Sequence, residues 1–295
     1  MRKNCVSFLG LVLGLAVIAL AAVWSPVWGQ VAGKVAARPS IADFQQLMAA
    51  VVTADWQGSG QFFIMMQRVF SPLFMGVLVL MLVLFAVHYL LVGSKSFAHD
   101  GEKVFYYSVL CRLVHALAAA SFTVLVISGL LIIFGKVFHG GELVRTARFF
   151  HAPAAVVFVP VSLVLFLLWV RDMLPAAYDL DWLLVFGGYL SRKKITVPAG
   201  KFNPGQKSWF WLAVAGGLVM AYTGYCLFSF SGDLPALRLA AVIHNLLGVV
   251  LLVMFMIHLY MALFAIKGSL QSMLTGYKSA EEVAQMHSEY WRRIS

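Results

Sequence analysis

The chain of 295 residues is too apolar for an ordinary soluble protein. Hydrophobic residues make up 62% of it and charged residues only 12%, against a charged fraction of about 25% in soluble domains. The formal net charge is +10, but nucleic-acid binding needs a soluble basic face, which so apolar a chain cannot build. The composition therefore excludes nucleic acid as a partner and predicts that membrane lipid surrounds most of the chain.

The N-terminus has the pattern of a secretory signal. Arg2 and Lys3 precede an apolar stretch over residues 6–23, and small residues follow up to Gly29. We predict a signal peptide over residues 1–29, with an uncleaved anchor helix as the alternative. In both cases residue 30 emerges outside the cytoplasm, so residues 30–70 are predicted to form a periplasmic segment.

Further along the chain, apolar runs recur at lengths that suit membrane crossing, for which a helix needs about 20 residues. Backbone polar groups must be satisfied inside a bilayer, so each run is predicted to be a helix. The fold class is therefore all-α integral membrane. The predicted spans are residues 71–92, 111–134, 152–170, 209–230 and 241–266, the first starting at Ser71-Pro72.

The charges indicate which ends of the helices face the cytoplasm. Most lysines and arginines fall in the predicted loops 93–108 and 171–208 and in the tail 267–295, rather than in the segments between them. Positive residues concentrate on the cytoplasmic side of membrane proteins. We therefore expect a multi-pass protein of a bacterial inner membrane with a cytoplasmic C-terminus.

Histidines are the unusual feature of the apolar runs. Polar side chains are costly in a membrane and suggest function, although any single histidine could instead hydrogen-bond to a neighbouring helix. The histidines in or at the ends of the runs are His88, His115, His151, His244 and His258. The others, His99, His139 and His287, lie in loops or the tail, where we expect them to be solvated.

Helix geometry predicts how these histidines pair. His244 and His258 are 14 residues apart, which places them within about 40° of one helix face and about 21 Å apart along the axis. His115 begins a helix at the inner side, and His151 begins the next at the outer side. Depth therefore pairs His115 with His258 and His151 with His244, whichever way the chain is inserted. Two imidazoles per site suit a six-coordinate b haem that carries single electrons.

Two glycines and a fifth histidine each allow two interpretations. Gly129 and Gly248 lie at helical spacings from His115 and His244 that would allow a porphyrin to approach closely, but glycines in membrane helices also serve helix packing. His88 lies at a depth similar to His115 and could replace it as a ligand.

Four segments carry a resemblance to a known family. From about residue 109 to the end, the chain resembles the gamma subunit, or cytochrome b556, of membrane-bound formate dehydrogenase. The matching segments are CRLVHALAAASFTVLVISG, ARFFHAP, KFNPGQKSWFW and IHNLLGVVLLVMFMIHLYMALFAIKGS. The resemblance implies a four-helix diheme bundle over 109–266, a cytoplasmic tail over 267–295 and one extra transmembrane helix over 71–92.

The resemblance also implies site residues. His115 with His258, and His151 with His244, would bind the iron of two b haems, in the pairing that depth predicts. A quinone, menaquinone or ubiquinone, would bind near Asn203, Gly205 and Gln206 at the cytoplasmic side. The alternative for these three residues is an ordinary Asn-Pro-Gly turn that leads into a helix.

The function implied is that of an electron-transfer subunit. Electrons would come from a periplasmic iron-sulfur beta subunit, pass through the two haems and reach quinone. No paired nucleophile and base is recognisable, so formate oxidation would belong to a molybdopterin or tungstopterin alpha subunit. An equivalent cytochrome of a hydrogenase or of a thiosulfate or polysulfide reductase is the alternative. A transporter without haem would carry intramembrane carboxylates, which the five runs lack, and a structural anchor would need no paired histidines.

Overall fold

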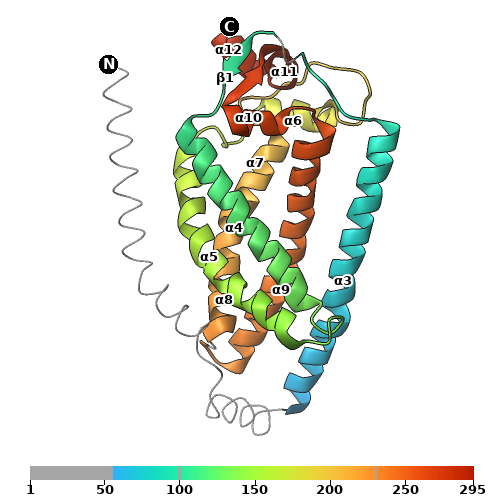
Figure 1. Ribbon diagram of the computed structural model, residues 1–295, viewed down its shortest axis with the longest axis vertical. Coiled ribbons are helices and arrows are strands. Elements are labelled where there is room, and N and C mark those ends of the chain that lie inside the picture. Colours follow the sequence, from blue (N-terminus) through green and yellow to red (C-terminus); the bar gives the residue numbers. More distant parts are fainter. Residues whose placement is uncertain (1–55, 99–100, 230) are drawn as a thin grey trace, which may run out of the picture. The chain divides into compact units, whose positions relative to one another are not determined.

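A computed structural model describes residues 56–98, 101–229 and 231–295, and its α-helices are labelled in Figure 1. The predicted signal peptide and most of the predicted periplasmic segment fall within residues 1–55, outside the described residues. The described part is mostly helical.

The prediction of five membrane spans is confirmed for this part of the chain. Five helices are long and apolar enough to cross a membrane: Arg68–Leu91, Val109–Ile133, Gly141–Trp169, Pro204–Ser229 and Leu234–Ala265. They correspond to α3 (Trp56–Leu91), α4 (Val109–Ile133), α5 (Gly141–Trp169), α7 (Pro204–Trp211) continued by α8 (Gly217–Ser229), and α9 (Leu234–Tyr260). Many of their apolar side chains are exposed, as a lipid solvent requires.

Two helix starts differ from the predicted ones. α3 begins at Trp56, so the predicted start at Ser71-Pro72 is wrong, and Pro72 lies inside the helix. A proline removes one backbone hydrogen bond, but the helical residues on both sides keep theirs. α5 begins at Gly141 and contains Pro153 and Pro160. His151 therefore lies within α5 rather than at its first residue.

Two spans contain a short π-helical segment. η2 (Leu212–Gly216) joins α7 to α8, and η3 (Met261–Ala265) follows α9. Single π turns inside α-helices often occur at functional sites. Here η3 begins three residues after His258, so a π turn lies next to one of the predicted haem ligands.

The chain divides into two compact units, and each contains one of the predicted histidine pairs. Unit 1 comprises residues up to Met75, Leu117–Val164 and Leu218–Leu247, and unit 2 comprises Gly76–Ala116, Leu165–Gly217 and Gly248–Ser295. The boundaries fall within the long helices, so α4, α5 and α9 each contribute to both units.

Unit 2 also contains short elements where we expected a loop and a tail. They are α6 (Tyr178–Leu184), η1 (Phe186–Gly188), α10 (Ser269–Thr275), α11 (Ala280–Met286), α12 (Ser288–Ile294) and the strands β1 (Lys103–Phe105) and β2 (Tyr277–Ser279). The strands pair antiparallel, with Lys103 opposite Ser279. A small core of unit 2 forms from Phe97, Trp182, Val197, Ala199 and Met286.

The expectation that His287 is solvated is wrong. Its exposure is only 3%, and its Nδ1–H donates to the Gly200 carbonyl at 2.8 Å. Burial, with a further contribution from the nearby charge of Lys278, lowers its pKa to about 3. The reason is a tertiary pairing that sequence alone does not reveal: Val197 N–H donates to the Gln285 carbonyl at 2.7 Å, which encloses the residues just after α11.

Candidate functional site

The structure brings together the histidines that helix depth paired. In unit 1 the ring centroids of His151 and His244 are 6.4 Å apart, with 60° between the ring planes. In unit 2 the centroids of His115 and His258 are 6.2 Å apart, with 55° between the planes. The hydrogen bonds of the described residues include none that joins the two rings of a pair. Each pair comes from two different helices, α5 with α9 and α4 with α9.

These separations match two imidazoles bound on opposite sides of one metal ion. Two metal–nitrogen bonds of about 2 Å each, plus roughly 1 Å from each bonding nitrogen to its ring centre, give about 6 Å. Simple packing of aromatic rings allows similar distances of about 4.5–7 Å. In unit 1 the hydrogen bonds of the rings distinguish the two arrangements.

In unit 1 a hydroxyl group fixes the protonation of each ring. The Ser128 hydroxyl donates to a backbone carbonyl one turn earlier at 2.5 Å, so its oxygen accepts from Nδ1 of His151 at 2.8 Å. The Thr223 hydroxyl likewise donates to a carbonyl at 2.8 Å and accepts from Nδ1 of His244 at 3.0 Å. A hydroxyl has one proton to give. Both rings are therefore protonated on Nδ1, which leaves the Nε2 lone pair for a metal, and metal-binding histidines usually donate their other N–H in this way.

A glycine follows each hydroxyl and lies against the same ring. A Cβ at Gly129 would be 3.4 Å from Cε1 of His151, and a Cβ at Gly224 would be 3.2 Å from Cε1 of His244. Sequence reasoning had left Gly129 open between porphyrin approach and helix packing, and it missed the hydroxyls and Gly224. A signal was present, because a Ser-Gly or Thr-Gly pair precedes each histidine by a similar interval, 23 residues from hydroxyl to ring in one case and 21 in the other.

In unit 2 aromatic rings surround the pair instead. Trp209 of α7 stacks on His258, with centroids 5.6 Å apart and 24° between the planes. Trp169, the last residue of α5, lies 6.1 Å from His115. Its Nε1–H is buried and has no hydrogen-bond acceptor among the described residues. An orphaned buried donor of this kind needs an explanation, and an acceptor group on a bound cofactor would supply one.

His88 does not join either pair. Its Nε2 hydrogen-bonds to the Tyr189 carbonyl at 2.9 Å, and its Nδ1 hydrogen-bonds to the Tyr260 hydroxyl at 2.5 Å. A carbonyl can only accept, so Nε2 carries the proton and Nδ1 accepts from the tyrosine. Both nitrogens are then used, and the arrangement attaches α3 to the rest of unit 2 rather than offering a ligand.

The predicted quinone residues form the cap of α7. Asn203 Oδ1 accepts from the Gln206 N–H at 3.0 Å, and Gln206 Oε1 accepts from the Asn203 N–H at 3.0 Å. A Cβ at Gly205 would lie 3.3 Å from Asn203 Oδ1, so a glycine keeps this cap open. The Asn203 amide also donates to the Tyr189 hydroxyl at 3.4 Å, and burial raises the pKa of that tyrosine. The Asn-Pro-Gly turn that leads into a helix is thus present, and the hydrogen bonds of the described residues include none from the Gln206 NH2 group.

Sequence reasoning also missed a buried ion pair beside this cap. Lys207 Nζ contacts both carboxylate oxygens of Asp179 at 2.9 and 2.7 Å. The two side chains are only 7% and 13% exposed. The ion pair connects α6 to α7. The sequence signal for it was a single lysine at the start of an apolar span, where a buried cation needs an acidic partner.

Comparison with known proteins identifies the family. A family model described as prokaryotic cytochrome b561 matches residues 106–276, more than half of the chain. The chain belongs to this family. The cytochrome is similar to the nitrate-inducible formate dehydrogenase cytochrome b556(Fdn) subunit of Escherichia coli (strain K12), with 28% identity over 51% of this chain and 71% of that protein. It is also similar to the cytochrome b556(fdo) subunit of the same strain, with 24% identity over 62% of this chain and 89% of that protein.

A third relative is the formate dehydrogenase cytochrome b556 subunit of Haemophilus influenzae, with 26% identity over 50% of this chain and 64% of that protein. The resemblance to cytochrome b556 subunits of formate dehydrogenase is thereby confirmed. With its five apolar helices, the chain is a multi-pass membrane cytochrome, and its family implies haem b. The imidazoles of unit 1 donate from Nδ1 and keep Nε2 for a metal, which fits such a group.

Proposed function

We propose that this cytochrome is the membrane-anchoring diheme subunit of a formate dehydrogenase complex, passing electrons from a periplasmic iron-sulfur subunit to quinone at the cytoplasmic side. The observation that carries the proposal is the presence of two separate histidine pairs, with ring centroids 6.2 and 6.4 Å apart. A single pair could be packing, but two pairs of the same spacing suit two cofactors. The relatives named as formate dehydrogenase subunits support the choice of complex.

In this proposal His115 and His258 hold one haem b, and His151 and His244 hold the second. When bound, each haem would supply one-electron transfer at a six-coordinate iron with no position open for oxygen. The chain's own residues orient the ligands: hydroxyls fix the tautomers in unit 1, and in unit 2 the stacked indole of Trp209 constrains the ring plane of His258. The Trp169 N–H would donate to an acceptor on the bound group.

Quinone reduction is assigned to the segment with Asn203, Gly205 and Gln206. Its support is the contact of Trp209 with His258, because Trp209 lies three residues after Gln206 on the same helix. The segment is therefore close to the histidine pair of unit 2. The Gln206 NH2 group is the available donor to a quinone carbonyl, and protons would enter from the cytoplasm.

The remaining parts of the proposal concern the assembly. Formate oxidation belongs to a molybdopterin or tungstopterin subunit, and the cytochrome sits in a bacterial inner membrane with its C-terminus in the cytoplasm. Residues 1–29 act as the signal peptide. Electrons moving inward work against the membrane potential by about 2.3 kcal/mol per charge per 100 mV, so the reaction would conserve energy.

The first test is a reduced-minus-oxidised spectrum of the purified chain with haem quantified per polypeptide. We expect two low-spin b haems; an absence of haem would favour the transporter or anchor alternative. The second test adds formate to membranes that contain the complex. Reduction of the b-haem bands by formate supports the proposed donor, whereas reduction by hydrogen alone would reassign the chain to a hydrogenase.

A further inference from the structure

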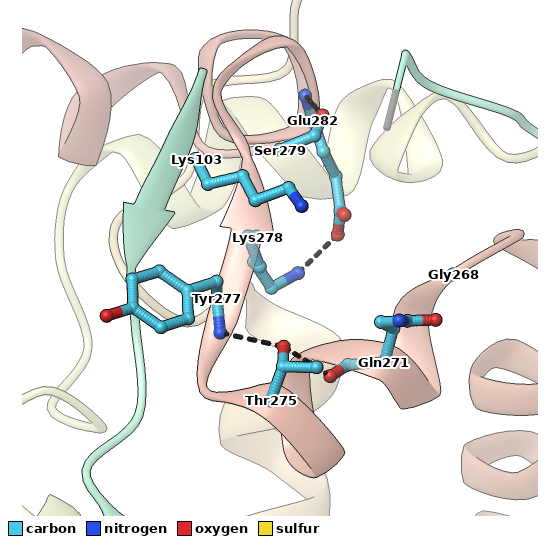
Figure 2. Close-up of a pocket in the computed structure, with 8 residues that line it drawn as sticks. All are labelled: Lys103, Gly268, Gln271, Thr275, Tyr277, Lys278, Ser279 and Glu282. Carbon is cyan, nitrogen blue, oxygen red and sulfur yellow. Dashed lines mark hydrogen bonds and ion pairs between the residues drawn. The ribbon is translucent and has the colours of Figure 1, made fainter. Parts of the chain in front are cut away.

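Two surface cavities of unit 2 differ in how their charges are balanced. The first has a volume of about 270 Å³, and Figure 2 shows the Lys278 ammonium directed at the Glu282 carboxylate within it. Both of these side chains are almost fully buried, so this cation is already neutralised, and Lys103 is the remaining cation in the lining. The second cavity, of about 230 Å³, has three cationic residues in its lining against a single carboxylate.

The second cavity keeps two guanidinium groups without a carboxylate partner among the described residues. Its one acid, Asp172, lies 3.7 Å from Lys201 and offsets that lysine in part. Arg293 donates only to the Tyr178 hydroxyl, at 3.4 Å, and Arg171 has no ion pair in the described part of the chain. A planar guanidinium matches the oxygens of a phosphate in a bidentate manner. The excess charge therefore favours a phosphate-bearing anion.

The position of the cavity indicates where that phosphate comes from. Arg171 follows a membrane span that ends at Trp169, and Lys201 precedes one that begins at Pro204. Basic pockets at the ends of membrane helices are suited to anionic lipid headgroups. Leu174, which is 53% exposed, adds an apolar rim that a free phosphate would not need but an acyl chain would contact.

We propose that this cavity binds the phosphate group of an anionic phospholipid. The lipid then attaches α12, which supplies Tyr290 and Arg293, to the connection between α5 and α6, which supplies Arg171. Burial and the nearby charge of Asp172 raise the pKa of Tyr290, so its hydroxyl stays protonated and able to donate. The attachment does not depend on the electron-transfer role of the chain.

The test measures the thermal unfolding midpoint of the haem-loaded protein in nanodiscs. Three conditions are compared: phosphatidylcholine alone, phosphatidylcholine with phosphatidylglycerol, and phosphatidylcholine with inorganic phosphate. The test variant is Arg171→Gln with Arg293→Gln. The matched control is Lys103→Gln with Lys193→Gln, which removes the same charge from exposed positions of unit 2 outside this cavity. An unchanged haem spectrum in each variant verifies folding.

We expect phosphatidylglycerol to raise the midpoint of the native protein and of the control by about 2–4 °C, and to have no such effect on the test variant. An equal rise with inorganic phosphate would support the anion site but assign it to free phosphate. A midpoint that does not respond to either anion, or that responds equally in the test variant, would overturn the proposal.

Discussion

The two histidine pairs are held by different kinds of neighbour. In unit 1 each ring donates from Nδ1 to a hydroxyl and rests on a glycine. In unit 2 the rings lie against the indoles of Trp169 and Trp209, and the described hydrogen bonds include none to either imidazole. A hydrogen bond selects which nitrogen is protonated, whereas stacking constrains only the plane of the ring.

This difference bears on electron transfer. A hydrogen bond from Nδ1–H raises the basicity of a histidine ligand, and a more basic ligand favours the oxidised form of a bound iron. The proposed haem of unit 1 should therefore have the lower midpoint potential. Electrons entering at unit 1 would then move downhill to unit 2, which agrees with the proposed direction.

The largest expected effect comes from removing one ligand. His258→Ala should lower the haem content from two per chain to one, because the pair of unit 2 loses an imidazole while the pair of unit 1 is untouched. Haem extraction and quantification measure this directly. The control is His88→Ala, which should keep both haems because the ring nitrogens of His88 are occupied by Tyr189 and Tyr260. Two haems in the His258 variant would break the assignment, and a lost haem in the His88 variant would restore His88 as a ligand.

The second largest expected effect is a loss of folding stability when the buried ion pair of unit 2 is broken. Lys207→Met leaves the Asp179 carboxylate buried and unpaired, which should cost about 3–5 kcal/mol of stability. The thermal unfolding of the purified protein reports the loss. Replacing both partners, with Asp179→Leu added, should recover most of it. Arg145→Met is the control, because its pair with Glu142 is exposed and should contribute less than about 1 kcal/mol. Equal effects of the two single variants would contradict the role of the buried pair.

The sequence was most informative where regular helix geometry determines which residues lie close together. The spacing of His244 and His258 on one helix, together with the depths of His115 and His151, predicted both pairings that the structure brings together. The hydroxyls were missed because serine and threonine are common in membrane helices, where they bond to their own backbone, as Thr123 does. The glycine that follows Ser128 and Thr223, and their similar intervals to His151 and His244, were the only sequence signals that set these two hydroxyls apart.

Unit 2's short elements were missed for another reason. Helices such as α11 and α12 have seven residues each, too few for a clear hydrophobic period. They are held by backbone bonds to distant residues, including Glu289 N–H to the Ala199 carbonyl at 3.1 Å. Such pairings have no local signal, and the same cause made the expectation for His287 wrong.

Removing the Thr223 hydroxyl tests whether the hydrogen bonds of unit 1 cause the expected difference in midpoint potential between the two haems. Thr223→Val keeps the shape of the side chain but takes away the hydroxyl that accepts from the His244 Nδ1–H. We expect haem affinity at unit 1 to fall by about 10–100-fold. Its midpoint potential should rise by up to about 60 mV, the equivalent of a tenfold change in relative affinity of the two oxidation states. Potentiometric titration with haem quantification separates the two sites.

The matched control is Thr123→Val. The Thr123 hydroxyl donates to the Ala119 carbonyl in α4 at 2.7 Å, and both potentials should stay at their native values. If Thr223→Val shifts the haem of unit 2 instead, or shifts neither, the hydrogen bond does not set the difference between the sites.

The smallest change is a single methyl group placed against a ring of unit 1. In Gly224→Ala the new Cβ would be 3.2 Å from His244 Cε1, closer than most real contacts, so the ring must move by a few tenths of an ångström. In Gly129→Ala the corresponding distance is 3.4 Å, an ordinary contact. The electron paramagnetic resonance signal of a low-spin haem responds to the angle between its two imidazole planes. We therefore expect Gly224→Ala to shift the signal of the unit 1 haem more than Gly129→Ala does. The control is Gly76→Ala, whose new Cβ has nothing within 4 Å and should leave both haem signals unchanged. A larger shift at unit 2 would mean that the glycines act through helix packing rather than through the ligand ring.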